Sequence, residues 1–392
     1  MRPLEGKIAV VAGATRGVGR GIACMLGEAG ATVYCTGRSV RGQLASGATR
    51  PETIEETAEM VTRYGGVGLP ARVDHTVPDD VRAFCDRVRR EHGALDILVN
   101  DVWGGDELTE WGKRLWEHSL DKGLLMQQRA VHAHFITSHF AIPLMLGRPA
   151  ERGRGLVVEV TDGIGGNYRG TFFYDLAKAS AIRMAHALAY ELRPYGITAL
   201  AVTPGFLRSE AMLDRFGVTE ANWQEGAKKD PHFAQSETPY FVGRAVAAIA
   251  ADPASWRMSG GAFTSWDLSD EYGFTDVDGR RPHWGRYMER EVKTRWPQFV
   301  ERVRSTFRER GRDPDQVLAH DRESLTLRAR LTPDGDPADW YARKILEPEL
   351  FLIDQGHLAA EFFDHYQDAV RGRAPGDHAP VAATGAESSE RA

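Results

Sequence analysis

A tyrosine and a lysine stand four residues apart within "VVEVTDGIGGNYRGTFFYDLAKAS" (157–180). Tyr174 and Lys178 are separated by one helical turn, so they share a face if this stretch is a helix. A free phenol has a pKa of about 10, which is too high for a good base near neutral pH. The charge of a neighbouring lysine stabilises the phenolate. The spacing alone favours a helix-start aromatic residue and a surface charge. The pair's place downstream of a glycine-rich loop and a strand-like run instead favours a general acid/base centre.

An acid stands where the apolar run before this pair ends. Thr161 and Asp162 lie 13 and 12 residues before Tyr174. Thr161 can donate a hydrogen bond to a substrate carbonyl, as a serine would. An ionised Asp162 can only accept one, and its charge would raise the pKa of Tyr174. A protonated Asp162 in an apolar pocket can donate instead. If a donor to substrate is needed here, as the family resemblance given below implies, either Thr161 or a protonated Asp162 is expected to supply it.

A glycine-rich loop near the N-terminus predicts a nucleotide site. The segment "AGATRGVGRGI" (12–22) follows a strand-like apolar run and opens a helical pattern. Glycines let such a turn close, and they let the backbone approach a pyrophosphate at the positive helix N-terminus. The loop residues expected to contact the cofactor are Gly13, Thr15, Arg16, Gly17, Val18 and Gly19.

The end of the next apolar run favours NADP(H) over NAD(H). An NAD site usually places an acid there, about 20 residues downstream, to bind the ribose 2′-hydroxyl. This chain has Thr36, Gly37 and Arg38 at that place. The missing acid removes repulsion, and Arg38 can bind a 2′-phosphate through two hydrogen bonds. With Arg16 in the nearby loop, the pattern predicts an NADP(H) site.

Short β-rich runs and longer helical patterns alternate over the first 270 residues. The helical patterns cover 17–29, 51–64, 78–92, 124–147 and 175–193. The expected strands are apolar on both faces, which is typical of strands covered by helices on both sides. These strands are 7–13, 31–37, 67–74, 95–100, 155–161, 197–205 and 261–267. The alternation predicts an α/β fold, a Rossmann-type doubly wound parallel sheet of about seven strands with a C-terminal α-helical extension.

The composition changes after about Thr275. We expect a nucleotide-binding Rossmann domain over 1–275, a helical extension over 276–371 and a disordered tail over 372–392, which is rich in Pro, Gly, Ala and Ser. The amphipathic helices of the extension suit two roles, packing against a partner subunit or covering the active-site mouth. Both roles stay open at this point.

Bulk properties exclude several classes of protein. The formal net charge of −6 does not indicate a nucleic-acid or acidic-membrane partner. No run approaches the 18 or more apolar residues of a membrane helix, and no signal peptide is evident. Three scattered cysteines suit a reducing compartment. We therefore expect a cytoplasmic protein with a small-molecule substrate.

With "AGATRGVG" and "YDLAK" in one chain, the sequence resembles the short-chain dehydrogenase/reductase family over residues 4–275. Asp74, "NDVWGG" (100–105) and "TPGFLRS" (203–209) match further family positions in the family's order. The segment "DLSDEYGFTDVDGRRP" (267–282) resembles the end of the fold in the branch named dehydrogenase/reductase SDR family member 1.

The resemblance implies an NADP(H)-dependent oxidoreductase that moves hydride between the nicotinamide and a carbonyl or alcohol carbon. It makes Tyr174 the general acid or base, and it makes Lys178 a ligand of the nicotinamide ribose. It also implies a homodimer or homotetramer and a small, apolar substrate. Further cofactor contacts are expected from Asp74, Asn100, Pro204, Gly205 and Leu207.

Departures from the family pattern keep a second hypothesis open. The family usually has Ser-Ser where this chain has Thr161-Asp162, and many members have an asparagine where this chain has Ala130. These differences also suit an NADP(H)-binding protein with little turnover, acting as a redox sensor or assembly scaffold.

Other conspicuous residues favour structural roles or leave two roles open. His132, His134 and His139 are expected to be structural or solvated, since residues two apart on a helix point to different faces. The region from Phe206 to Phe216 is expected to form a substrate lid. The tryptophans that either wall an apolar substrate pocket or pack in the interior are Trp103, Trp111 and Trp116.

Overall fold

Seven parallel strands form one sheet in the order β3-β2-β1-β4-β5-β6-β7. The computed structural model describes residues 2–45, 50–148, 152–164, 168–291, 294 and 308. The order reverses between β1 and β4, as in a doubly wound sheet. The strands are β1 (Ile8–Ala12), β2 (Thr32–Gly37), β3 (Val67–Arg72), β4 (Ile97–Asn100), β5 (Gly155–Val160), β6 (Ile197–Thr203) and β7 (Ala262–Thr264). The predicted Rossmann-type sheet is confirmed.

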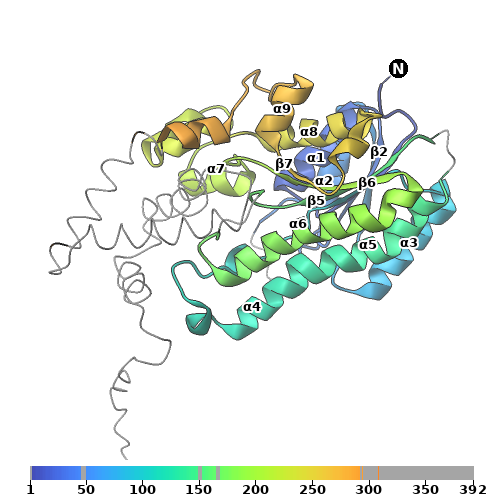
Figure 1. The fold of residues 1–392 in the computed structure, drawn as a ribbon, viewed down its shortest axis with the longest axis horizontal. Helices are drawn as coiled ribbons and strands as arrows, with labels where there is room; N and C mark the ends of the chain where they lie inside the picture. The colour runs from blue at the N-terminus through green and yellow to red at the C-terminus, as the bar shows by residue number, and fades with distance from the viewer. Residues whose placement is uncertain are drawn as a thin grey trace, which may run out of the picture. The chain divides into compact units, whose positions relative to one another are not determined.

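Helices cover both faces of this sheet (Figure 1). One face carries α1 (Gly17–Glu28), α2 (Ile54–Arg63) and α8 (Pro239–Ala251). The opposite face carries α3 (Pro78–His92), α4 (Leu120–Gln127), α5 (Ala133–Leu146) and α6 (Phe172–Leu192). Because both faces are covered, the strands lack the alternation of an exposed sheet, and every residue of β1, β4, β5 and β6 is buried.

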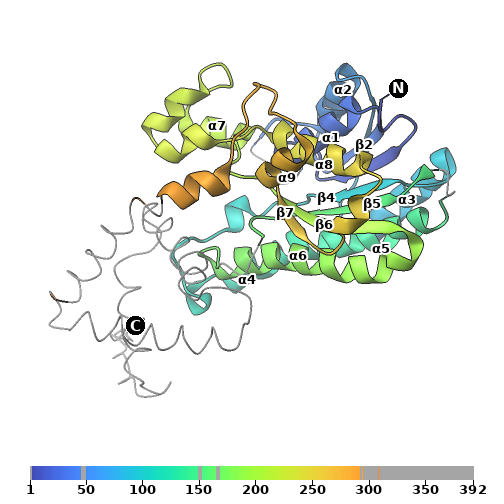
Figure 2. The same cartoon turned by 45° about the horizontal axis from the view of Figure 1, so that its top comes forward.

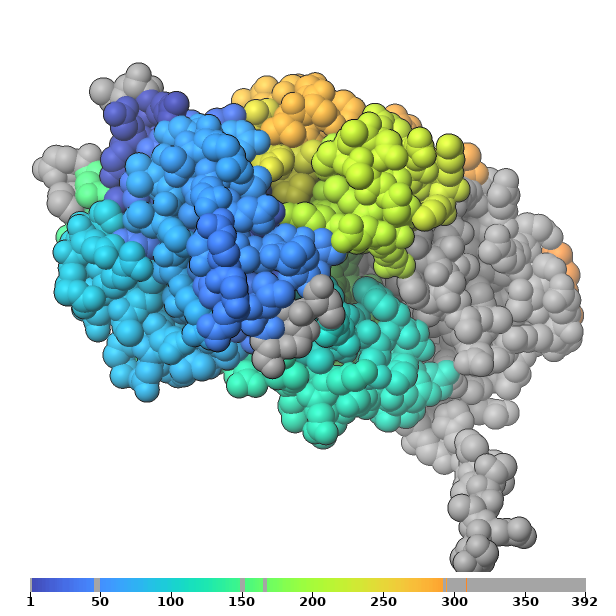
Figure 3. Space-filling view, turned by 180° about the vertical axis from the view of Figure 1, so that it is seen from behind, coloured from blue at the N-terminus to red at the C-terminus, as the bar shows by residue number. Residues whose placement is uncertain are grey.

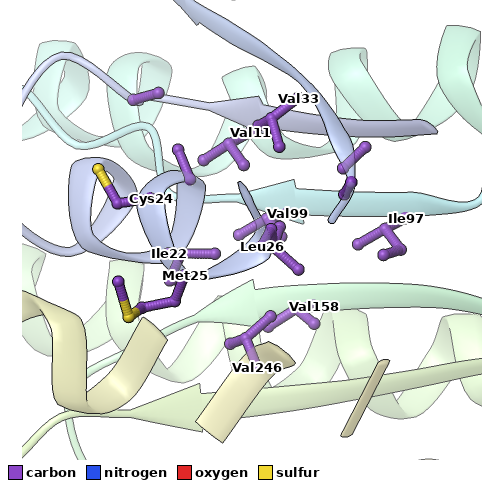
Figure 4. Close-up of a cluster of buried hydrophobic side chains, with 14 of the residues drawn as sticks. Val11, Ile22, Cys24, Met25, Leu26, Val33, Ile97, Val99, Val158 and Val246 are labelled. Carbon is purple, nitrogen blue, oxygen red and sulfur yellow. The ribbon is translucent and has the colours of Figure 1, made fainter. Parts of the chain in front are cut away.

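Helix α1 packs its apolar side chains against the middle of the sheet (Figure 4). Ile22, Met25 and Leu26 of α1 meet Val11 of β1 and Val246 of α8 in one buried cluster. Full burial of each such aliphatic side chain contributes about 1.5–3 kcal/mol. This packing holds the first turn of α1, and therefore the glycine loop, in a fixed place beside the strand ends.

The predicted seventh strand is shorter than expected. The range 261–267 was expected to be extended, but β7 ends at Thr264 and helix α9 (Ser265–Tyr272) begins there. The Thr264 side chain accepts a hydrogen bond from the backbone N–H of Asp267, which caps the new helix. A threonine cap therefore ended the strand within an otherwise strand-like run.

The long helix expected over 124–147 begins earlier and contains an irregular turn. Helix α4 starts after the Ser119 cap, and a π-helical turn, η3 (Gln128–His132), joins it to α5. Such wide turns are frequent at functional sites. Here the turn contains Ala130, the position where the family pattern led us to look for an asparagine.

Two compact units divide the chain, residues 1–293 and 294–392. The first unit therefore continues past the expected boundary at Thr275. Hydrogen bonds hold the added segment: among them, the Asp276 carboxylate accepts from the backbone N–H of Thr238, and the Tyr287 hydroxyl lies 2.8 Å from His232 Nδ1. The helices predicted beyond residue 294 and the predicted tail lie outside the described residues, apart from Arg308.

Helix α7 (Glu210–Phe216) and the short turns after it lie beyond one end of the sheet (Figure 2). This segment follows β6 directly, so it stands at the carboxyl edge of the strands. No described helix is long and apolar enough to cross a membrane.

Candidate active site

The carboxyl edge of the parallel strands gathers most of the predicted site residues. Gly13 follows β1, Arg38 follows β2, Asn100 ends β4 and Asp162 closely follows β5. Doubly wound sheets bind ligands at this edge, near the point where the strand order reverses. In the space-filling view, a hollow separates the yellow-green surface of the α7 segment from the teal surface around α4 (Figure 3). The site therefore lies between the predicted lid and the sheet.

Helix α6 presents Tyr174 and Lys178 toward this edge. The helix begins at Phe172, after Thr171 in extended conformation, so Tyr174 lies in its first turn rather than just before it. The Tyr174 hydroxyl donates a 2.7 Å hydrogen bond to Asp162 Oδ2. The structure thus brings the tyrosine, the lysine and the strand-end acid together.

Asp162 is held as a carboxylate by an arginine that the sequence reasoning missed. Arg169 Nε donates to Asp162 Oδ2 at 3.2 Å, and Arg169 Nη2 bonds Oδ1. Burial alone would raise the pKa of Asp162, but the charge of Arg169 and the hydrogen bond from Tyr174 lower it below its usual value. A protonated Asp162 that donates to substrate is therefore disfavoured, because its bidentate arginine partner stabilises the anion.

The same carboxylate sets the acidity of Tyr174. Burial and the charge of Asp162 together raise the pKa of the phenol well above its ordinary value, and Arg169 opposes this only in part. Tyr174 is therefore a neutral phenol at physiological pH. In this state it can donate a proton, but it is a poor base.

Thr161, the other expected donor, has a hydrogen-bond partner in α6. Its hydroxyl donates to the backbone carbonyl of Lys178 at 2.8 Å, and its backbone N–H bonds Val202 O. The side chain is only 2% exposed. Thr161 therefore ties β5 to α6 and positions Lys178, and its proton is engaged in that bond.

Aromatic rings surround the tyrosine. The Trp103 ring lies 5.3 Å from the Tyr174 ring in an edge-to-face arrangement, and the Trp111 ring lies 5.4 Å away. Lys178 Nζ stands 4.0 Å from the centre of the Trp103 ring, a cation–π distance. Trp116, in contrast, is 76% exposed and contacts Arg114. Two of the three predicted tryptophans thus form apolar walls at Tyr174, and the third does not.

Burial also lowers the pKa of Lys178, and the negative charges of Asp162, Asp101 and Asp106 oppose that shift. The lysine therefore sits among acids that favour its cationic form, while burial disfavours that form. A cation there stabilises a phenolate on Tyr174, as the spacing of the pair predicted.

The glycine loop has the geometry that a nucleotide phosphate requires. Gly13 has φ +91° and Gly17 has φ +57°, in the region that favours glycine. A Cβ on Gly13 would clash with the backbone of Asp101, and a Cβ on Gly19 would lie 2.8 Å from Asp101 Oδ2. The loop can close against β4 only because these positions lack side chains.

The N-terminus of α1 already holds an anionic group. The Gly17 backbone N–H donates to Glu210 Oε2 at 2.9 Å, and Arg20 Nη1 lies 3.3 Å from Glu210 Oε1. Glu210 belongs to α7, in the predicted lid. An oxyanion at the positive end of a helix is the interaction that a cofactor phosphate makes. The residues present therefore fit a dinucleotide, and Glu210 stands in for one of its oxyanions.

The two predicted phosphate-binding arginines are partly exposed and paired with acids. Arg16 Nε lies 3.6 Å from Glu52, and Arg38 Nη1 lies 3.9 Å from Asp74. Both distances exceed a hydrogen bond, so a bound phosphate can compete for either guanidinium. Arg38 is at the end of β2, where the sequence placed it.

Some predicted cofactor contacts have other partners in this structure. The Asn100 side chain is buried and donates to Ser138 Oγ and Glu159 Oε1 at 2.9 and 2.7 Å, so it links β4 to α5 and β5. Asp74 accepts from the backbone and hydroxyl of Thr76. Both side chains form hydrogen bonds with other groups of the protein, so they have structural roles in this structure.

The buried side chain of Glu237 holds the segment after β6 in place. The Gly205 N–H donates to Glu237 Oε2 at 3.0 Å, and the backbones of Leu207 and Glu237 form a short bridge. Burial raises the pKa of Glu237 to about 8. Pro204, Gly205 and Leu207 therefore form a fixed border of the site, while α7 follows them as the predicted lid.

Sequence reasoning also missed a buried polar group beneath the site. His134, expected to be structural or solvated, is buried; its Nδ1 lies 2.7 Å from Glu159 Oε2 and its Nε2 lies 3.0 Å from Val102 O. The signal in the sequence was Glu159, an acid inside an otherwise apolar strand, which requires a buried partner.

Comparison with known proteins agrees with the fold. The model of the short chain dehydrogenase family matches residues 7–216. The mouse protein "Dehydrogenase/reductase SDR family member 1" is 34% identical over 283 residues, covering 71% of this chain and 85% of its own. This chain belongs to the short-chain dehydrogenase/reductase family, a class of oxidoreductases with a nicotinamide-binding fold. The predicted resemblance to the branch of that mouse protein is confirmed.

More distant relatives and solved structures share the fold. The "3-oxoacyl-[acyl-carrier-protein] reductase FabG" of Vibrio harveyi is 29% identical over 66% of this chain and 98% of its own. A short chain dehydrogenase from Mycobacterium thermoresistibile superposes with a TM-score of 0.59 at 24% identity, covering 72% of this chain and 92% of its own. A putative dehydrogenase from Xanthomonas campestris gives 0.58 at 25% identity, with coverages of 71% and 94%.

Proposed function

We propose that this protein is an NADP(H)-dependent oxidoreductase that reduces the carbonyl group of a small, apolar substrate, or oxidises the corresponding alcohol. The observation that carries the proposal is the hydrogen bond from Tyr174 to Asp162, with Lys178 one turn away, at the carboxyl edge of the sheet. The reductase relatives support the carbonyl as the substrate group, since the Vibrio harveyi protein is named for a ketone substrate.

The glycine loop would hold the cofactor phosphates, with Gly13, Gly17 and Gly19 providing close backbone approach. Arg16 and Arg38 would bind the 2′-phosphate, and Lys178 would hold the nicotinamide ribose. The bound cofactor supplies or accepts the hydride. The fit of this group rests on the oxyanion already present at the first turn of α1.

Tyr174 supplies the proton to the substrate oxygen when its hydroxyl turns from Asp162 Oδ2, its acceptor in this structure, to that oxygen. Because burial and Asp162 raise its pKa, the phenol keeps its proton until negative charge develops on that oxygen. Lys178 then stabilises the phenolate. A raised pKa favours the acid role over the base role, so we propose carbonyl reduction as the direction in which this site works best.

Trp103 and Trp111 support an apolar substrate. Both rings contact Tyr174, so a substrate carbonyl that reaches the phenol passes between aromatic surfaces.

Removal of the Glu210 charge should strengthen cofactor binding. Glu210 competes with the cofactor phosphates for the Gly17 N–H, so Glu210→Gln should lower the Kd for NADPH about threefold or more, the size of a charge effect at a helix N-terminus. Fluorescence titration measures this. Asp214→Asn, on the same helix but paired with Arg50, is the matched control. A weaker or unchanged Kd in Glu210→Gln would contradict this competition.

Loss of Arg38 should weaken the binding of NADPH and leave the binding of NADH almost unchanged. Arg38→Ala removes a charge-assisted contact to the 2′-phosphate, so the Kd for NADPH should rise about tenfold while the Kd for NADH changes little. Arg41→Ala is the control, since Arg41 is exposed and bonds Glu59. An equal rise in the Kd for both cofactors would show that Arg38 does not bind the 2′-phosphate.

A parallel titration with NADPH and NADH tests the proposed cofactor directly. Tight NADPH binding with much weaker NADH binding supports NADP(H) as the cofactor. Apolar ketones and aldehydes are then screened as substrates. Binding of neither by folded protein would remove the basis of the proposal. The subunit number, proposed to be two or four in a cytoplasmic protein, is measured by light scattering of the full chain.

A further inference from the structure

A small cavity lies beside Lys178, and Asp162 is not among its lining residues. It offers about 10 Å³ to the centre of a water molecule, which is room for about one water. Three of its lining residues carry ionisable groups, Lys178 from α6, Asp101 after β4 and His134 from α5. Ala130 in the π-helical turn lines the same space, and its short side chain leaves it open.

Asp101 is packed into this place by the glycine loop. Its backbone N–H donates to Ala12 O, and its Oδ2 lies 2.8 Å from the point where a Cβ of Gly19 would stand. The loop glycines thus have a second consequence besides cofactor approach: they leave space for a carboxyl group between α1 and the cavity. Asp101 is the acid that lines the cavity together with Lys178.

We propose that Asp101 stores the proton that Lys178 returns to Tyr174 after each turnover, and that one water in the cavity carries it. This inference rests on the proposed function. After Tyr174 has given its proton to the substrate oxygen, the phenolate regains a proton from the Lys178 ammonium across a bridging hydroxyl or water. The Lys178 amine then takes a proton from the cavity water, which takes one from the Asp101 carboxylic acid. Solvent reprotonates the carboxylate, so no net proton is lost from the protein.

The surroundings of Asp101 suit a group that gains and loses a proton near neutral pH. Burial raises its pKa to about 7, while Lys178 and His134 oppose that shift. Lys178 is in turn influenced by Asp162 and Asp106, and His134 faces Glu159 and lies near His75. An acid with a pKa near the working pH transfers protons efficiently in both directions.

The pair of His134 and Glu159 keeps the far wall of the cavity polar and fixed. Both nitrogens of His134 face oxygen atoms, Glu159 Oε2 at 2.7 Å and Val102 O at 3.0 Å. The Nε2 contact also holds the backbone of the residue after Asp101. His134 is therefore a positioning residue for Asp101.

Carbon-13 NMR of labelled Asp carboxyl groups tests the inference without turnover. The Asp101 signal, assigned with Asp101→Asn or, if that variant does not fold, with Asp101→Glu, should titrate with a midpoint near 7. Lys178→Met should move the midpoint upward, because the opposing positive charge is lost. Asp106→Asn, which changes an acid near Lys178 outside the cavity, is the matched control and should leave the midpoint in place. Two results would overturn the inference: an Asp101 carboxyl group that stays ionised from pH 5 to pH 8, or a titration midpoint that does not move in Lys178→Met.

A second measurement separates this inference from the proposed function. Wild-type kcat for carbonyl reduction should fall as pH rises through about 7. In Asp101→Asn, kcat should be about tenfold lower and should no longer fall over this pH range, while the Kd for NADPH stays unchanged. The amide oxygen can still accept from the Gly19 N–H, so a purely structural Asp101 would leave the pH profile unchanged. That unchanged profile would refute the relay alone. Failure of the wild-type protein to oxidise NADPH with any carbonyl would refute the proposed function, and with it the relay.

Discussion

Tyr174→Phe should reduce NADPH-linked carbonyl turnover about 10³-fold while leaving the Kd for NADPH almost unchanged. The phenylalanine retains the ring that packs between Trp103 and Trp111, so the walls of the site stay in place. Only the hydroxyl is lost, and a positioned general acid contributes about 10²–10⁴-fold. Steady-state kinetics with a responsive ketone and fluorescence titration with NADPH measure the two quantities.

Tyr190→Phe is the matched control for this substitution. Tyr190 lies on the same helix and is 84% exposed, so loss of its hydroxyl should leave turnover unchanged. Full activity of Tyr174→Phe would contradict the acid role. Capture of a partner protein that depends on NADPH and survives Tyr174→Phe would instead favour the alternative function, a cofactor-binding redox sensor or assembly scaffold.

Asp162→Ser should shift the enzyme toward alcohol oxidation. The carboxylate raises the pKa of Tyr174, so its removal lowers that pKa and increases the fraction of phenolate at a given pH. A neighbouring charge shifts a pKa by about 1–3 units, so the oxidation rate at pH 8 should rise about tenfold or more. The pH profile of oxidation should move to lower pH by the same amount.

Asp162→Asn separates the two effects of this change, because it removes the charge without adding a hydroxyl. If the charge is the cause, both variants shift the pH profile; if only a hydroxyl donor matters, Asp162→Ser alone gains activity. Thermal melting checks folding, since Arg169 loses its bidentate partner in both variants. An unshifted pH profile of oxidation in both variants would show that Asp162 does not set the pKa of Tyr174.

Several parts of this protein are readable from short stretches of sequence. The glycine spacing at 13–19 and the Tyr174–Lys178 pair depend on turns and single helical turns, which neighbouring residues determine. The alternation of Val- and Ile-rich runs with amphipathic helices predicts the doubly wound sheet, because strands covered on both faces must be apolar throughout. The strand expected over 261–267 was wrong at its end, since a single cap at Thr264 outweighed the extended pattern.

Contacts between distant segments decided the rest of the site. Glu210 reaches Gly17 from 193 residues away, and no local pattern marks it as an occupant of the helix N-terminus. Whether Asp162 is a carboxylate or a neutral acid depends on Arg169, which a loop brings back to the strand end. The sequence left both protonation states open, because a pKa is set by burial and by charges within a few ångströms.

The sequence by itself determined the class of fold, the position of the glycine loop and the one-turn spacing of Tyr174 and Lys178, all of which follow from local spacing and periodic burial. Only the tertiary structure decided that Thr161 bonds α6, that Asp162 is paired and anionic, and that Asp101 shares a cavity with Lys178. The reason is physical: hydrogen-bond partners, desolvation and charge–charge distances belong to the packed arrangement of α1, α5, α6 and the strand ends, and no single segment of the chain contains them.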